Sequence, residues 1–294
     1  MSSVSPRVLA LLGALTLLWG TNWVMFRISL DELPVLTFRS AALIVALIAL
    51  LTILLLRGES LAVPPGRWPA LIGASFTNFF IWHVTTSLAV LYIPSGHASV
   101  LAYTMPLWVA PLSWLLFRQK LTARLMLALA IGAVAVAALM APNFQSYAGA
   151  PWGLFWGLFA AISWAFGTFI IKGTTWPGMG LSLTFWQVAI SLPPMLLGAL
   201  VFDGLPTHWP SRTVIATTLY TGAVPMAFGM AAWLELVKLL PTQVAALSSI
   251  AVPIVAIVSG VLVLNEPLSW LQAIAIASTV VSLRLALVPR PGVG

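Results

Sequence analysis

The sequence predicts an all-α membrane protein of ten transmembrane helices, arranged as two inverted-topology repeats of five helices each. Its 294 residues are 61% hydrophobic and only 6% charged, whereas a soluble domain carries roughly 25% charged residues. The apolar runs have the length of membrane-crossing helices, and the strand-length alternation of an outer-membrane barrel is absent. One stretch of the first half also recurs in the second half. These three observations predict the fold class.

The recurring stretch covers residues 90–106 and returns at 237–253, a constant offset of 147 residues. A fixed offset near half the chain length indicates two copies of one unit, which we expect to occupy residues 1–146 and 147–294. Each copy has one proline at the start of an apolar run and another about three turns further in, where the missing N–H leaves a carbonyl without its usual donor. Interrupted helices at corresponding positions of two halves point to the binding site of a transporter. The candidate hinges are Pro94, Pro106, Pro241 and Pro253.

Ten segments are long enough to cross about 30 Å of hydrocarbon. Turn residues or charges separate them, and no stretch is left over for a soluble domain. The predicted spans are 8–27, 34–56, 68–91, 94–117, 121–141, 151–171, 180–202, 211–236, 241–264 and 268–288.

Lysine and arginine residues predict the orientation, because they gather on the cytoplasmic side of membrane proteins. Ten fall on one side of the predicted spans and two, Arg27 and Arg212, on the other. We therefore expect both termini in the cytoplasm of a multi-pass protein of a bacterial inner membrane. Five spans per unit is an odd number, so the two units must have opposite orientations. Arg27 accordingly falls outside, while Lys172, its mate in the second repeat, falls inside.

Composition excludes several classes of protein. The basic residues are scattered at helix ends and form no patch for nucleic acid, although the isoelectric point is near 10.6. The chain has no cysteine, three histidines and six acids, which are too few and too scattered for a metal cluster. No catalytic constellation appears. We therefore predict no cofactor, no metal and no enzyme activity, and no signal peptide, because the first apolar run lacks a cleavage site.

The repeats contain motifs of a known family. The fourth span of each half opens with Pro-Ser or Pro-Thr, and residues 265–268 form an Asn-Glu-Pro-Leu turn. With the two five-span halves, these features resemble the drug/metabolite transporter superfamily, EamA type, and within it the aromatic amino-acid exporters. The resemblance implies a central cavity between the halves and alternating access. Gln119 stands where Glu266 stands in the second half, so the acidic turn is carried over only to Glu266.

Few ionisable groups are placed within the membrane. No carboxylate lies near a predicted midplane, which weighs against proton or sodium antiport through a buried acid. His83 is the only titratable group near the middle of a span. It is either a neutral histidine bonded to a neighbouring helix or a ligand contact and proton-sensitive gate. Arg39, about one turn inside its span, is expected to reach the interface or to pair with Asp31 or Glu32.

Aromatic residues give the second indication of a binding site. Several of the fourteen tryptophans lie deep within spans, and Trp19, Asn22, Trp23 and Phe26 share one helix face. Packing is the alternative for each of them. An aromatic cavity with a few polar anchors suits a ligand with a flat ring and a polar head, and aromatic faces also attract organic cations. The candidate substrate-binding residues are Trp19, Asn22, Asn78, Trp82, His83, Tyr103, Trp164, Trp186, Gln243, Ser248 and Ser249.

The leading hypothesis is an exporter of small amphipathic metabolites, with aromatic and other hydrophobic amino acids first. The rival transporter hypothesis is a broad drug or organic-cation efflux protein. A lipid scramblase and a membrane enzyme are the alternatives from other classes. The expected partners are a small-molecule substrate and membrane lipid, and both a monomer and a homodimer remain open.

Overall fold

The computed structural model describes residues 6–118, 151–204, 208–233 and 242–266, together with scattered positions between 123 and 134 and between 270 and 281. Secondary structure in these parts of the chain is helical throughout, without a strand. This confirms the predicted all-α class. The described helices that are long and apolar enough to cross a membrane number five: Ala10–Leu30, Val35–Arg57, Pro151–Lys172, Leu181–Asp203 and Arg212–Trp233.

The elements follow the predicted spans closely. In the first half they are α1 (Pro6–Leu30), α2 (Val35–Arg57), α3 (Trp68–Ser75), the π-helical segment η1 (Phe76–Ile81), α4 (Trp82–Tyr92), α5 (Ser95–Ala102) and α6 (Met105–Phe117). In the second half they are α9 (Pro151–Lys172), α10 (Leu181–Gly198), the π-helical η3 (Ala199–Asp203), α11 (Arg212–Thr221), the π-helical η4 (Gly222–Phe228) and α13 (Thr242–Leu264). The predicted spans at 121–141 and 268–288 lie largely outside the described residues.

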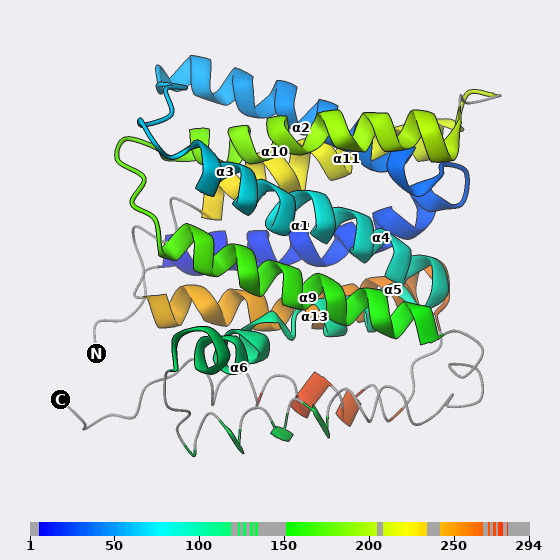
Figure 1. Ribbon diagram of the computed structural model, residues 1–294. Helices are drawn as coiled ribbons and strands as arrows, with labels where there is room; N and C mark the ends of the chain where they lie inside the picture. Colours follow the sequence, from blue (N-terminus) through cyan, green and yellow to red (C-terminus); the bar gives the residue numbers. More distant parts are fainter. Residues whose placement is uncertain are drawn as a thin grey trace.

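The long helices lie side by side and reverse direction from one to the next (Figure 1). In that view α1, α10 and α13 run from left to right, whereas α2, α9 and α11 run from right to left. The most extensive helix–helix contacts join the two halves of the chain: α1 packs on α13, α4 on α9, and α2 on α10. The core therefore lies between the halves, and its large cluster draws buried side chains from both.

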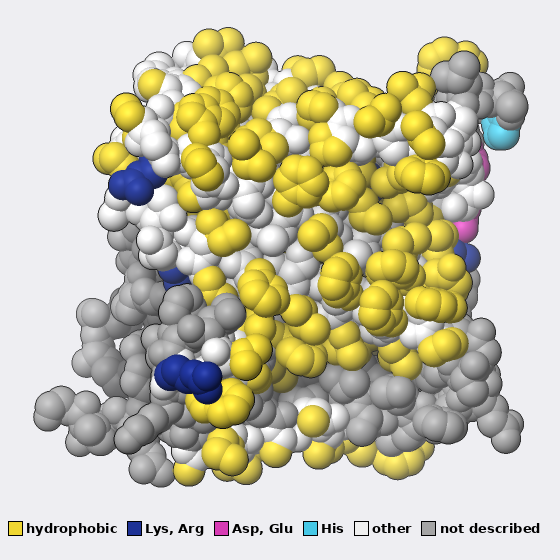
Figure 2. Space-filling view, viewed as in Figure 1, with side chains coloured by type: hydrophobic (Ala, Val, Ile, Leu, Met, Phe, Trp, Pro, Cys, Tyr) yellow, Lys and Arg dark blue, Asp and Glu magenta, His cyan; other side chains and the backbone are white. Residues whose placement is uncertain are grey.

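The outer surface suits a bilayer. Hydrophobic side chains are spread across the described part of the face in Figure 2, and the charged side chains visible there lie toward the two ends of the helices. Large apolar residues stand exposed on the helix flanks, among them Ile48, Leu56 and Phe202. In water such a surface would be costly at about 25 cal/mol per Å2, whereas lipid tails accept it at no cost.

Carboxylates at the right-hand end of Figure 1 bind the beginnings of helices. An acidic side chain near a helix N-terminus accepts hydrogen bonds from free N–H groups and interacts favourably with the helix dipole. Each of these contacts joins one half of the chain to the other. The pairs are Asp203 Oδ2 with Thr37 N and Oγ1 at 2.7 and 2.9 Å, Glu266 Oε1 with Ser95 N and Oγ at 2.9 Å each, and Glu32 Oε2 with Ser211 N at 2.6 Å.

The predicted span at 94–117 is broken into two helices. Pro94 precedes the first residue of α5, and α5 ends at Ala102. A turn at Tyr103 and Thr104 follows before α6 begins at Met105. Pro106 is the second residue of α6, where a proline is tolerated because its N–H would be free in any case. In the second half α13 continues through Pro253 without a break, so the two prolines at matching positions have different effects.

Candidate functional site

Four buried aromatic side chains line the interior of the first half. On α1, Trp23 and Phe26 lie one turn apart with ring centroids 5.5 Å from each other. The ring of Tyr103, at the break after α5, is 6.4 Å from Trp23. The ring of Phe38, on α2, is 5.9 Å from Phe26. We call these four residues the aromatic wall; it joins α1, α2 and the α5–α6 break.

Arg39 lies at one end of the aromatic wall and is buried, with 1% of its surface exposed. Its guanidinium carbon stands 3.8 Å from the ring centre of Phe26. Its Nε donates to the backbone oxygen of His83 at 2.9 Å and to Ser87 Oγ at 2.6 Å, and its Nη2 donates to Thr86 Oγ1 at 3.1 Å. The expectation that Arg39 reaches the interface or pairs with a loop acid is therefore wrong. Hydroxyl groups on α4, more than forty positions away in the sequence, hold its side chain inside.

Three of the predicted site residues have buried polar atoms without a hydrogen-bond partner in the described structure: Asn22 Oδ1, Asn78 Oδ1 and His83 Nδ1. His83 packs edge-on against Phe79, with ring centroids 5.5 Å apart. A polar atom left without a partner in a protein interior costs roughly 1–3 kcal/mol. Such atoms are suited to receive water or the polar head of a ligand.

A second group of predicted residues meets between α4 and α9. The rings of Trp82 and Trp164 have centroids 4.7 Å apart. One turn along, Gly167 allows α9 to approach Asn78, since a Cβ at position 167 would overlap Asn78 Oδ1. Ser163 Oγ, which the sequence did not single out, donates to the backbone oxygen of Thr77 at 2.7 Å. In the sequence, the feature that could have pointed to Ser163 is its position next to Trp164, a predicted site residue.

The π-helical segments η1 and η4 occupy matching places in the two halves, because residues 76–81 shifted by the repeat offset of 147 become 223–228. A π-helical turn disturbs the regular hydrogen-bond ladder and frequently marks a functional site. In each segment a side chain of another helix donates to a backbone oxygen. Ser163 bonds Thr77 in η1, and Trp19 Nε1 bonds Pro225 in η4 at 3.2 Å.

The remaining predicted residues do not join these groups. Trp186 lies at the opposite end of the helices from the carboxylate caps; its Nε1 donates to the oxygen of Leu61 at 2.8 Å and its ring meets Trp68 edge-on. Gln243, Ser248 and Ser249 belong to the helical backbone of α13, but their side chains lie outside the described structure, as does Pro241.

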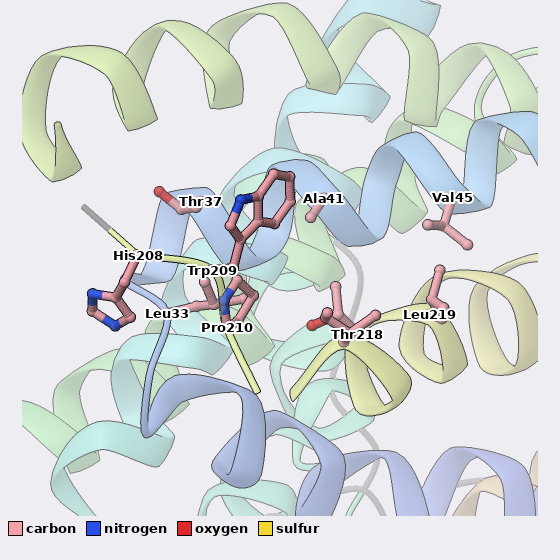
Figure 3. Close-up of a pocket in the computed structure, with 10 residues that line it drawn as sticks. Leu33, Thr37, Ala41, Val45, His208, Trp209, Pro210, Thr218 and Leu219 are labelled. Atoms are coloured by element: carbon pink, nitrogen blue, oxygen red, sulfur yellow. The ribbon is translucent and has the colours of Figure 1, made fainter. Parts of the chain in front are cut away.

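An apolar groove opens between α2 and α11 (Figure 3). It has a volume of about 550 Å3. Trp209, 92% exposed, stands over it, while Thr37, Ala41 and Val45 point into it from α2. The predicted site residues are not among those that line this groove, so we assign it no part in the site.

Within the described residues, no group of three or more histidine, aspartate or glutamate side chains could hold a metal ion. In the described part of the interior lie a set of aromatic rings, the buried cation Arg39 and several polar atoms without a hydrogen-bond partner there. Apolar helices of membrane-crossing length around such an interior have the construction of a membrane transporter. The chain belongs to the EamA-like transporter family, whose model matches it twice, at residues 7–141 and 151–288.

Similar proteins carry transporter names. A probable amino-acid metabolite efflux pump of Escherichia coli (strain K12) is 28% identical over an alignment of 275 residues that covers 90% of this chain and 89% of that protein. The uncharacterized transporter YvbV of Bacillus subtilis is 24% identical over 90% of this chain and 86% of its own length. The uncharacterized inner membrane transporter YedA of Escherichia coli (strain K12) is 26% identical over 90% and 85%. A crystal structure with 19% identity superposes with a TM-score of 0.65 over 96% of this chain and 97% of the other, and shows the shared fold.

Proposed function

We propose that this chain exports small amphipathic metabolites, with aromatic and other hydrophobic amino acids first, through a site between its two halves. The observation that carries this proposal is the set of buried polar atoms on Asn22, Asn78 and His83 that have no partner among the described residues and lie among buried aromatic rings. An aromatic amino acid supplies both kinds of partner, since its ring packs on aromatic side chains and its charged head forms hydrogen bonds. The name of the similar efflux pump agrees with this substrate class.

Alternating access between two inverted repeats, residues 1–146 and 147–294, is the proposed mechanism. Matching helices of the two repeats run in opposite directions: α1 runs from left to right in Figure 1 and α9 from right to left. The double match of the family model supports two homologous halves. The proposed points of bending are Pro94, just before α5, Pro106, in the first turn of α6, and the π-helical segments η1 and η4.

Efflux of organic cations is the second transporter hypothesis, because aromatic faces attract cations. Arg39 disfavours it. A second positive charge about 4 Å from a buried guanidinium would be repelled by roughly 4 kcal/mol at an effective dielectric constant near 20. An anionic or zwitterionic substrate meets no such penalty.

Coupling to ions through a buried carboxylate has no support among the described residues. Asp31, Glu32, Glu59, Asp203 and Glu266 all lie at helix ends or in turns; Glu235 lies outside the described residues. We therefore propose transport down a gradient, or transport with a modest pH dependence that passes through His83.

Uptake into proteoliposomes tests the proposal directly. We expect the purified protein to carry radiolabelled L-phenylalanine and L-tryptophan in preference to glycine and to tetraphenylphosphonium, with little change when a pH gradient is imposed. Preference for tetraphenylphosphonium would favour the organic-cation hypothesis. Steep proton-driven uptake that is indifferent to His83→Gln would contradict the coupling proposed here.

Trp82→Ala separates a binding role from packing. Loss of the ring beside Trp164 should lower uptake of aromatic substrates several-fold, and uptake of small hydrophobic substrates much less, because only the aromatic substrates stack there. The matched control is Trp209→Ala, which removes an exposed indole and should leave the ratio of the two uptakes unchanged. Equal loss for all substrates in Trp82→Ala would assign this tryptophan to packing.

A further inference from the structure

Arg39 is a buried cation without a carboxylate partner in the described structure. Its hydrogen-bond acceptors are two hydroxyls and one backbone oxygen on α4, all of them neutral. A buried charge is stable only when it is well paired and hydrogen-bonded, because removing it from water costs several kcal/mol. The cation–π contacts with Phe26 and Phe38, at 3.8 and 5.0 Å, offset part of that cost but supply no negative charge.

The described acids are all engaged elsewhere. Asp31 and Glu59 lie near Arg27 and Arg57 in exposed ion pairs. The other three described acids bind helix beginnings between the two halves. One of them, Asp203, binds Thr37 on the same helix as Arg39. Two residues along an α-helix correspond to a rotation of about 200°, so Thr37 and Arg39 face nearly opposite ways.

The guanidinium also has donors to spare. A guanidinium has five N–H groups in a planar fork. The hydrogen bonds of Arg39 leave from Nε and Nη2, and Nη1 has no partner in the described structure. A carboxylate fits such a fork through two parallel hydrogen bonds, which makes arginine suited to recognising carboxylates inside proteins.

The aromatic wall leads directly to this cation. Ring contacts connect Tyr103 to Trp23, Trp23 to Phe26, and Phe26 to the guanidinium. A molecule that carries a carboxylate a short distance from a flat ring can satisfy both parts at once. The aromatic wall and the free Nη1 donor of Arg39 together suit one class of ligand, a molecule with a carboxylate close to a flat ring.

We infer that Arg39 binds the carboxylate of the transported substrate, while the aromatic wall packs on its side chain. The inference rests on the proposed function and deepens it, because it names the charged group that the site selects. The side chain is enclosed in this conformation by residues of α1, α2 and α4, so the substrate reaches it in a conformation in which these helices lie further apart. The competing role is a purely structural one, in which Arg39 ties α2 to α4.

The test uses proteoliposomes with the full-length chain and a pair of ligands. L-Phenylalanine and L-phenylalaninamide share the ring and the ammonium group, but only the first has a carboxylate. In the wild type, L-phenylalanine should compete with labelled L-phenylalanine at least about tenfold better than the amide, since a charge-assisted hydrogen bond contributes roughly 1.5–3 kcal/mol. Arg39→Gln should remove this preference, and Arg39→Lys, which keeps the charge but loses the fork, should restore part of it.

The outcomes separate the two roles. If Arg39→Gln lowers competition by both ligands equally, or if Arg39→Lys restores nothing, the structural role is correct. If Arg39→Gln does not fold, as judged by gel filtration and thermal unfolding, the wild-type comparison decides, and equal competition by acid and amide overturns the inference. Failure of the wild type to carry any aromatic amino acid would instead overturn the proposed function.

Discussion

At the residue scale, three acidic side chains bind helix beginnings across the contact between the two halves. Asp203 and Glu266 each accept two hydrogen bonds from one residue in the first turn of a helix in the other half, through its backbone N–H and its hydroxyl. Glu32 reaches in the other direction, from the first half to Ser211. Charged groups placed in this way stabilise the contact between halves without entering the membrane interior.

Glu32 makes the stability of the folded protein depend on pH. The backbone N–H of Ser211, and then its side chain, hold the pKa of Glu32 below its usual range. A depressed pKa means that the carboxylate form favours the folded state, so the contribution is complete above the unfolded pKa of about 4.3 and is lost as the pH falls through the lower, folded value. We expect Glu32→Gln to lower the Tm slightly at neutral pH and to match the wild type below both pKa values.

The neighbouring substitution Asp31→Asn is the matched control. Among the described residues, the Asp31 carboxylate pairs with Arg27 at 3.5 Å in an exposed ion pair. Such pairs contribute little, so the Tm of Asp31→Asn should stay close to that of the wild type at neutral pH. Thermal unfolding in detergent across the pH range measures both variants. A Tm difference for Glu32→Gln that is the same at every pH would contradict the cap.

Arg39 shows where prediction from the sequence ends at this scale. The sequence placed it one turn inside a span and therefore suggested a route to the interface. Its actual partners, Thr86 and Ser87, lie on α4. No local sequence pattern shows which face of α4 is turned toward α2. Burial of a charge depends on contacts between distant segments, whereas periodicity reports only which residues share a face.

At the element scale, glycine residues set how closely the two halves approach. Gly20 lies where α1 packs on α13. A Cβ there would overlap the side chain of Val255 and come within 3.1 Å of the backbone oxygen of Val252. Small residues allow helices in a membrane to approach closely and gain van der Waals contact.

Gly20→Ala should therefore destabilise the protein by about 1–3 kcal/mol, as overpacking does, and slow transport, because the affected interface lies between the halves. Gly13→Ala, on the same helix, is the control: a Cβ there meets nothing within 4 Å. Alanine at position 13 should be neutral or slightly stabilising, because alanine favours helix more than glycine by about 1 kcal/mol. Thermal unfolding and uptake measure both; similar effects for the two variants would contradict this packing.

Most helices were predictable from the length and composition of the apolar runs. The expected spans at 34–56, 151–171 and 241–264 agree with α2, α9 and α13 within a residue or two. The break at Tyr103 and Thr104 was not predicted, although Pro106 was recognised as a point of disruption. A proline removes one N–H wherever it occurs, but whether the helix bends or ends depends on the surrounding packing, as the unbroken α13 at Pro253 shows.

At the scale of the whole molecule, contacts at the two ends assign the connecting segments to opposite faces. The turn after α2 lies beside the connection between α9 and α10, where Arg67 Nη2 donates to Thr175 Oγ1 at 2.9 Å. The turn after η3 lies with the carboxylate caps at the other end, through Asp203 and Thr37. The turns after α2 and after η3 therefore lie at opposite ends of the helices, which is the arrangement that the proposed inverted repeat requires.

Cysteine labelling tests this arrangement in a membrane, and the chain has no cysteine of its own. Gly58 and Gly204 occupy the two turns, but their φ angles of 63° and 77° would strain any other residue. The better positions are Ser60 and Trp209, which are exposed and lie close by.

From the distribution of lysine and arginine, we expect a membrane-impermeant maleimide to label Trp209→Cys in intact cells. Ser60→Cys should react only after permeabilisation. Labelling of both positions from one side would rule out the inverted repeat, and with it the proposed exchange of access between the halves.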